Sequence, residues 1–186
     1  MNVDRTDRSS EFDEILWRGP DTFLGYLDAS LNDAAFTEDG FFRTGDLGRF
    51  DDDGYLHIVG RIKDIINRSG EKISASSVES VLSQHPDVSE VAIVAGPDPV
   101  TGERGCAFVV PEVGRSIDLA EVQTFLESHR IARQKFPESV FVVDSLPRTP
   151  SGKIRKFALR EWTRDRSELP RHMAGITIAA SFEVDR

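Results

Sequence analysis

Residues 76–95 read SSVESVLSQHPDVSEVAIVA. Ser76 and Glu79 have the spacing of a capping box, in which the hydroxyl caps a backbone N–H group and the carboxylate reaches back to the cap residue. Apolar side chains then recur at helical spacing over 78–82, and the β-branched run Val88–Ala95 predicts a strand. This stretch therefore predicts a helix that leads directly into a strand.

The downstream sequence repeats this pattern. Asp118 and Glu121 again have capping spacing, ahead of an apolar helical face. The remaining segments are predicted as strands over 106–110 and 140–143, helices over 119–126 and 154–162, and a polar loop over 97–105. The sequence therefore predicts an α+β domain in which helices pack on a three-stranded sheet.

The upstream sequence is rich in predicted hairpins. A short strand is expected over Glu14–Trp17, and Phe41–Phe50 and Tyr55–Val59 flank the acidic turn Asp51–Gly54. The three aspartates of that turn raise a metal site as an alternative, but their turn chemistry accounts for them fully. A second hairpin is predicted over Gly60–Lys72.

Composition narrows the classes of function. The chain has 186 residues, a formal net charge of −9 and a pI of about 5.0, which argues against a broad nucleic-acid surface. Cys106 is the single cysteine, so no internal disulfide can form, and a reducing cytoplasm is expected. No apolar run approaches the roughly 18 residues of a membrane span, and the polar N-terminus does not read as a signal peptide.

Three segments carry candidate chemistry: Phe42–Asp46, Gly60–Ile73 and Pro147–Lys153. Taken alone, each has an ordinary interpretation, namely a turn, a solvated hairpin and an exposed lysine. The Gly152–Lys153 pair is not a P-loop, because the loop lacks the required earlier glycine and Ile154 follows the lysine.

Together, in this order and at these separations, the segments resemble the adenylate-forming (ANL) superfamily. That group includes acyl- and aryl-CoA ligases, peptide-synthetase adenylation domains and beetle luciferases. The resemblance runs from about Glu14 to Trp162. Gly40–Asp46 is similar to the family's ribose-binding motif, and Leu146–Lys153 is similar to its C-terminal lysine motif.

The resemblance implies a role for each matching residue. Lys153 would be the catalytic lysine, bridging the carboxylate substrate and the α-phosphate, and would bind nucleotide together with Asp46 and Arg61. Asp46 would hold the ribose hydroxyls. Lys63 would be the hinge, and Ser69–Gly70 would face the pantetheine arm of CoA.

The resemblance also implies a domain organisation. The expected parts are a disordered segment or tag over 1–13, a β-hairpin-rich remnant of the large N-terminal AMP-binding domain over 14–60, a mobile C-terminal domain over 61–162, and a tail over 163–186. The family's phosphate-binding loop and acyl pocket are not found in these residues.

The implied function is the C-terminal portion of an ATP-dependent acyl-CoA ligase for a fatty or aryl acid, which forms an acyl-adenylate and then a CoA thioester, with fatty acid metabolism as the implied context. The isolated chain is expected to be inactive. The implied ligands are ATP or AMP, CoA and Mg²⁺, with the magnesium ligands outside this chain, and the implied partner is an N-terminal ligase domain. The alternatives are a subunit that completes a separate N-terminal partner and a non-catalytic interaction module.

Overall fold

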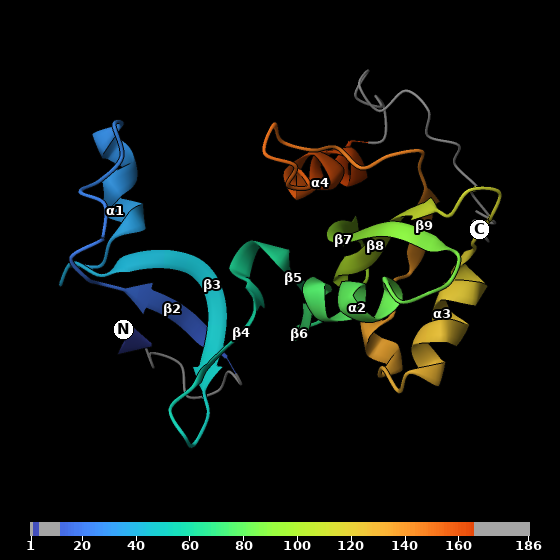
Figure 1. Cartoon of the computed structure of the whole chain (residues 1–186), viewed down its shortest axis with the longest axis horizontal. Coiled ribbons are helices and arrows are strands. Elements are labelled where there is room, and N and C mark those ends of the chain that lie inside the picture. Colours follow the sequence, from blue (N-terminus) through green and yellow to red (C-terminus); the bar gives the residue numbers. More distant parts are fainter. Residues whose placement is uncertain (1, 4–11, 166–186) are drawn as a thin grey trace. The chain divides into compact units, whose positions relative to one another are not determined.

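The computed structural model describes residues 2–3 and 12–165 (Figure 1). The segment expected over 1–13 and the tail expected over 163–186 lie largely outside the described residues. The chain divides into two compact units, Met1–Lys63 and Asp64–Arg186.

The first unit is built on an antiparallel sheet with the strand order β1-β2-β3-β4. Its elements are β1 (Asn2–Val3), β2 (Asp13–Trp17), η1 (Ala29–Leu31), α1 (Asn32–Ala35), β3 (Phe42–Phe50) and β4 (Leu56–Arg61). The predicted hairpin is confirmed as β3 and β4, which are joined at the acidic turn. Asp51 holds that turn, because its carboxylate accepts the N–H groups of Asp53 and Tyr55 and contacts His57 at 2.6 Å.

The second unit is a mixed α+β structure with a five-stranded sheet. Its elements are β5 (Ile65–Arg68), β6 (Glu71–Ser74), α2 (Ala75–Leu82), β7 (Val88–Asp98), β8 (Gly102–Pro111), α3 (Leu119–Ser128), η3 (Arg133–Lys135), β9 (Ser139–Val142) and α4 (Lys156–Arg164). The 3-10 turn η2 (Ile62–Asp64) leads into this unit.

The three predicted strands are present as β7, β8 and β9, but the expected three-stranded sheet is wrong in its strand number. β8 pairs with β7 along its whole length and with β9 in parallel. The hairpin β5–β6 joins the same sheet through the pair Arg68–Gly102, which makes five strands.

Two further expectations need correction. The polar loop expected over 97–105 is largely strand, since β7 and β8 remain paired down to Asp98–Gly102, beyond the apolar part of the sheet. The cap of α2 is Ser74 rather than Ser76, because the helix begins two residues earlier and the Ser74 side chain accepts the Ser77 N–H. The capping box of Asp118 and Glu121 at α3 is confirmed.

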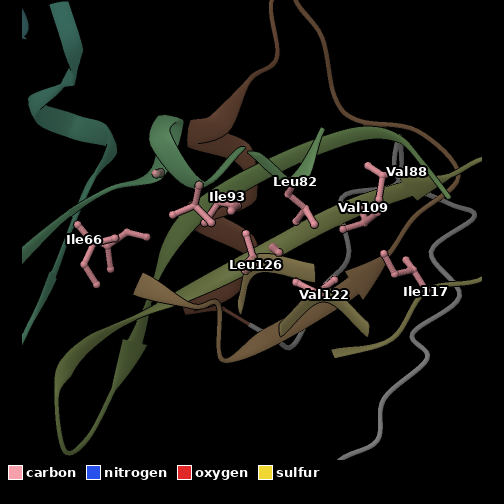
Figure 2. Close-up of a cluster of buried hydrophobic side chains, with 12 residues drawn as sticks. Ile66, Leu82, Val88, Ile93, Val109, Ile117, Val122 and Leu126 are labelled. Carbon is pink, nitrogen blue, oxygen red and sulfur yellow. The ribbon is translucent and has the colours of Figure 1, made fainter. Parts of the chain in front are cut away.

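Strand alternation divides the core of the second unit between the two faces of the sheet. Figure 2 shows the first cluster, in which Ile93 and Val109 of the sheet meet Leu82 of α2 and Leu126 of α3. The second cluster lies on the other face, where the neighbouring sheet residues pack with helix α4. Its members are Ala92, Val94, Cys106, Phe108, Phe141, Val143, Leu146, Leu159 and Trp162.

The helix α4 therefore covers the face opposite to α2 and α3 (Figure 1). Cys106 is buried in the second cluster, as expected of a small apolar residue. Within residues 12–165, no helix is long and apolar enough to cross a membrane.

Candidate functional site

In the first unit, two of the predicted nucleotide-binding residues meet across a strand pair. Asp46 of β3 and Arg61 of β4 are register partners. The Arg61 Nε donates to Asp46 Oδ1 at 2.6 Å, and a second guanidinium nitrogen donates to the carbonyl of Thr44 at 3.4 Å. The guanidinium therefore orients the Asp46 carboxylate from one side.

The bulged stretch of β3 that presents Asp46 is held by Glu14, a residue that none of the sequence motifs identified. Glu14 accepts the Gly45 N–H at 3.0 Å and pairs with Arg43 at 3.2 Å. Gly45 has a φ of 71°, a left-handed conformation that favours glycine. The Thr44 hydroxyl donates to the Ile15 carbonyl at 2.7 Å and accepts the Asp46 N–H. No local pattern links Glu14 to this part of β3, since the contact depends on the pairing of β2 with β3.

The predicted hinge residue, Lys63, lies where the two compact units join. It is the last residue of the first unit, and Asp64 is the first residue of the second. Lys63 is exposed within the short 3-10 turn η2. The structure locates the residue, while its role as a hinge stays a prediction.

The predicted CoA-facing residues, Ser69 and Gly70, form the two-residue tip of the β5–β6 hairpin. Their φ values are 51° and 91°, as in the primed turns that match the twist of paired strands. Ser69 donates its N–H to the Thr101 carbonyl at 2.8 Å, which ties the tip to the β7–β8 turn.

That second turn is organised by Asp98. Its carboxylate accepts the N–H groups of Thr101 and Val100 and the Thr101 hydroxyl. These hydrogen bonds stabilise the charged form, so the pKa of Asp98 lies below its ordinary value. The exposed tip of the β5–β6 hairpin is therefore hydrogen-bonded to the β7–β8 turn, which the Asp98 carboxylate in turn stabilises.

Lys153 lies at the end of a closed turn before α4. The Gly152 N–H donates to the Thr149 carbonyl at 2.9 Å, and the Thr149 N–H donates to the Lys153 carbonyl at 2.8 Å. Pro150 occupies the position where its fixed φ favours the turn, and Gly152 has a φ of 85°. The Lys153 N–H also donates to Thr149 Oγ1 at 3.1 Å.

The side chain of Lys153 is exposed, and its ammonium makes no hydrogen bond or ion pair within the described part of the chain. A closed turn thus presents one cation to solvent at a defined point. An ammonium in such a position can meet oxygen atoms of two anions at once.

Arg148 stabilises this turn through two hydrogen bonds. The sequence motifs did not identify Arg148 as a candidate residue. One of its terminal nitrogens donates to the Gly152 carbonyl at 2.6 Å, and the other donates to Glu90 of β7 at 2.7 Å. The Lys153 turn is therefore attached to the sheet by a side chain as well as by the backbone. Glu90 lies 58 residues earlier in the chain, so no local pattern could have identified the pair.

The geometry supports two kinds of interaction. The Asp46 carboxylate has hydrogen-bond capacity beyond that used by Arg61, which suits hydroxyl donors, while Lys153 suits anions. In residues 12–165, no group of three His, Cys, Asp or Glu side chains is arranged to hold a metal ion.

Comparison with known proteins yields a consistent set of matches. Residues 77–153 match the family described as the AMP-binding enzyme C-terminal domain. The chain is 46% identical over 159 residues to 2,3-dihydroxybenzoate-AMP ligase of Bacillus subtilis (strain 168), covering 85% of this chain and 29% of the relative. It is 47% identical over 146 residues to the medium-chain fatty-acid–CoA ligase of Escherichia coli (strain K12), covering 77% and 26%.

The structural matches agree with these relatives. ATP-bound MatB from Rhodopseudomonas palustris matches with a TM-score of 0.76 and 37% identity, covering 85% of this chain and 31% of that structure. The o-succinylbenzoate CoA synthetase MenE from Bacillus subtilis, in complex with the acyl-adenylate intermediate OSB-AMP, matches with a TM-score of 0.75 and 33% identity, covering 88% and 33%. In each case the chain spans a third or less of its relative's length.

Proposed function

Because the chain carries the AMP-binding enzyme C-terminal domain of the adenylate-forming superfamily, we propose that it is the C-terminal portion of an ATP-dependent acyl- or aryl-CoA ligase. In the proposed reaction, a carboxylate attacks the α-phosphate of ATP and pyrophosphate leaves. The thiol of CoA then attacks the acyl-adenylate, and AMP leaves. The expected ligands are therefore ATP or AMP, CoA and a carboxylic acid, with Mg²⁺ accompanying ATP.

The observation that carries this proposal is the presentation of Lys153. Its ammonium is exposed, it makes no ion pair within the described residues, and its turn is closed by backbone hydrogen bonds and braced by Arg148. In the first step, negative charge develops between the attacking carboxylate and the phosphate. A positioned cation stabilises such charge without having to reorganise at the moment of reaction.

Asp46 and Arg61 would act on the nucleotide. The Arg61 guanidinium occupies Oδ1 of Asp46, which leaves Oδ2 to accept a hydrogen bond from a ribose hydroxyl. An exposed part of Arg61 then remains to face a phosphate group. Asp46 would thus bind the neutral ribose while Arg61 binds the charged phosphate, which explains why a site for an anionic ligand contains a carboxylate.

The second step would use the other predicted residues. Rotation at Lys63 would withdraw Lys153 and bring the hairpin tip at Ser69–Gly70 towards the pantetheine arm of CoA. The position of Lys63 at the junction of two compact units supports this role, because hinges are a few residues that absorb a large change in φ and ψ. Gly70 also lets a ligand approach the backbone closely.

Exposed apolar side chains support a covering partner for the first unit. Leu24, Leu27, Tyr55 and Ile58 are all strongly exposed. Exposed apolar residues mark an interaction site when they lie together in one patch. We infer that the remainder of a large AMP-binding domain covers them, and that it supplies the phosphate-binding loop and the acyl pocket.

A chimera tests the proposal. Residues 12–165 should replace the matched segment of the Escherichia coli medium-chain fatty-acid–CoA ligase with retention of fatty acyl-CoA formation. The 186-residue chain alone should show no ATP–pyrophosphate exchange with any of several carboxylates. An inactive but folded chimera, or clear exchange by the chain alone, would contradict the proposal. Restoration of activity by mixing the chain with a separate N-terminal domain would instead support the subunit alternative.

A further inference from the structure

Four charged side chains, two acidic and two basic, form a network that joins α4 to α2 and to the first residue of the second unit. Lys156 contacts Glu79 at 2.8 Å and Asp64 at 3.8 Å, and Arg160 contacts Asp64 at 2.9 Å. Each of the four side chains keeps only 17–19% of its surface exposed. Glu79 also accepts the Ile93 N–H, which brings β7 into the network.

This network differs from ordinary surface ion pairs. Exposed pairs contribute little because water and salt screen them. Here two anions and two cations are largely withdrawn from water, so removal of one cation leaves a carboxylate without its partner in a poorly solvated place. The arrangement of these groups is therefore restricted more strongly than that of a solvated pair.

The network links parts of the chain that lie far apart in sequence. The pair Lys156–Glu79 spans 77 residues, and Arg160–Asp64 spans 96 residues. At one end, Asp64 directly follows Lys63, where the two compact units join. At the other end, Lys156 begins α4, immediately after the Lys153 turn.

We propose that Lys156, with Asp64, Glu79 and Arg160, is a positioning residue that fixes the Lys153 turn to the segment directly after the hinge. This inference rests on the proposed function for its catalytic meaning. A rotation at Lys63 moves Lys153 by the same angle only if the start of the second unit and the first turn of α4 move as one rigid body. The network supplies that connection by side chains, independently of the long path of the backbone through the sheet.

Arg148 and Lys156 hold the Lys153 turn through two separate sets of contacts. Arg148 ties the turn itself to β7 through Glu90. Lys156 ties the helix that follows the turn to α2 and to Asp64. Only the second attachment reaches the hinge, and so only its loss should separate the motion of Lys153 from that of Asp64.

Amide hydrogen exchange on the complete chain tests the physical part of the proposal. Lys156→Met keeps the length of the side chain and removes its charge, and Asp64→Asn keeps the shape of the carboxylate. Both should accelerate exchange at Thr149, Gly152 and Arg155 by about tenfold, through local opening rather than global unfolding. Exchange in β8 should not change.

The matched control is Lys135→Met, because Lys135 is exposed and forms no ion pair within the described residues. The decisive observation is the effect of Asp64→Asn on a turn more than 80 positions further along the sequence. The proposal is overturned if amide exchange at the Lys153 turn is no faster in the Asp64→Asn and Lys156→Met variants than in the Lys135→Met variant. Asp64→Asn keeps the test decisive if Lys156→Met lowers the global stability.

The chimeric ligase separates this inference from the proposed function. Lys156→Met should lower kcat for adenylation by about tenfold and leave the KM for ATP unchanged, while Lys156→Arg should restore most of the rate. If Lys153→Ala has no effect on adenylation, the proposed function fails. If Lys153→Ala acts as expected but Lys156→Met behaves like Lys135→Met, the positioning role alone is refuted.

Discussion

Replacement of Lys153 by alanine isolates the chemistry of the site from the stability of the fold. The side chain is exposed, and its ammonium has no partner within the described residues. The turn uses the backbone N–H and carbonyl groups of Lys153, both of which alanine keeps. The free energy of unfolding of the chain should therefore change by less than about 0.5 kcal/mol.

The effect on adenylation should be large by comparison. Loss of one positioned electrostatic contact to developing charge slows the step by about 100- to 1000-fold, or roughly 2.7–4 kcal/mol. Thioester formation from supplied acyl-adenylate should be largely unaffected, because the phosphate attack is already complete. Lys153→Arg should restore little activity, since a planar guanidinium does not replace a compact point charge.

Two separate assays on the chimeric ligase decide the matter. ATP–pyrophosphate exchange measures the first step, and CoA consumption with synthetic acyl-adenylate measures the second. Urea unfolding of the unfused chain provides the stability control. Equal slowing of both steps would refute the reasoning, because Lys153 would then serve nucleotide binding or structure in general rather than the first transition state.

Four further outcomes are expected. Lys63→Pro in the chimera should spare adenylation and block the thiol step, because it fixes φ at the hinge, and the same pair of assays measures both. Ser69→Val should destabilise the chain by about 1–2 kcal/mol in urea unfolding, since a β-branched residue is strained at a φ of 51°, whereas Ser69→Gly should be tolerated. Leu126→Ala should lower the free energy of unfolding by about 2–5 kcal/mol, because Leu126 is fully buried; a smaller loss would indicate a core that can collapse around the site. The pKa of Asp98 is lowered by its turn hydrogen bonds, so its contribution to stability is present above its ordinary pKa of 3.8 and is lost as the pH falls through the lower folded value. When the free energy of unfolding is measured as a function of pH, Asp98→Asn should therefore reduce the loss of stability at acidic pH.

Local patterns predicted many of the elements correctly. The box of Asp118 and Glu121 begins α3, and the β-branched run at Val88 begins β7. The acidic turn does join the two strands of the first hairpin. These signals succeed because capping, strand propensity and turn chemistry act over a few neighbouring residues.

Other predictions were wrong where contacts with residues distant in sequence determined which of two locally possible structures formed. Ser74 rather than Ser76 caps α2, and Glu79 does not complete a capping box there, because its carboxylate is engaged by Lys156 and the Ile93 N–H. Polar residues beyond Ala95 read as a loop, yet the long pairing of β7 with β8 extends through them. In both cases a distant partner outweighed a weak local preference.

For the candidate site, the sequence by itself determined which residues could carry the chemistry. The motifs that end at Asp46 and Lys153 are contiguous, so their residue types and spacing are visible without a structure. Only the tertiary structure decided how those residues are held. Arg61 orients Asp46 across a strand pair, Arg148 binds Glu90, and Lys156 meets Asp64 and Glu79. These contacts depend on which segments the sheet and the buried core bring together, and side-chain charges carry no information about distant partners until the chain has folded around them.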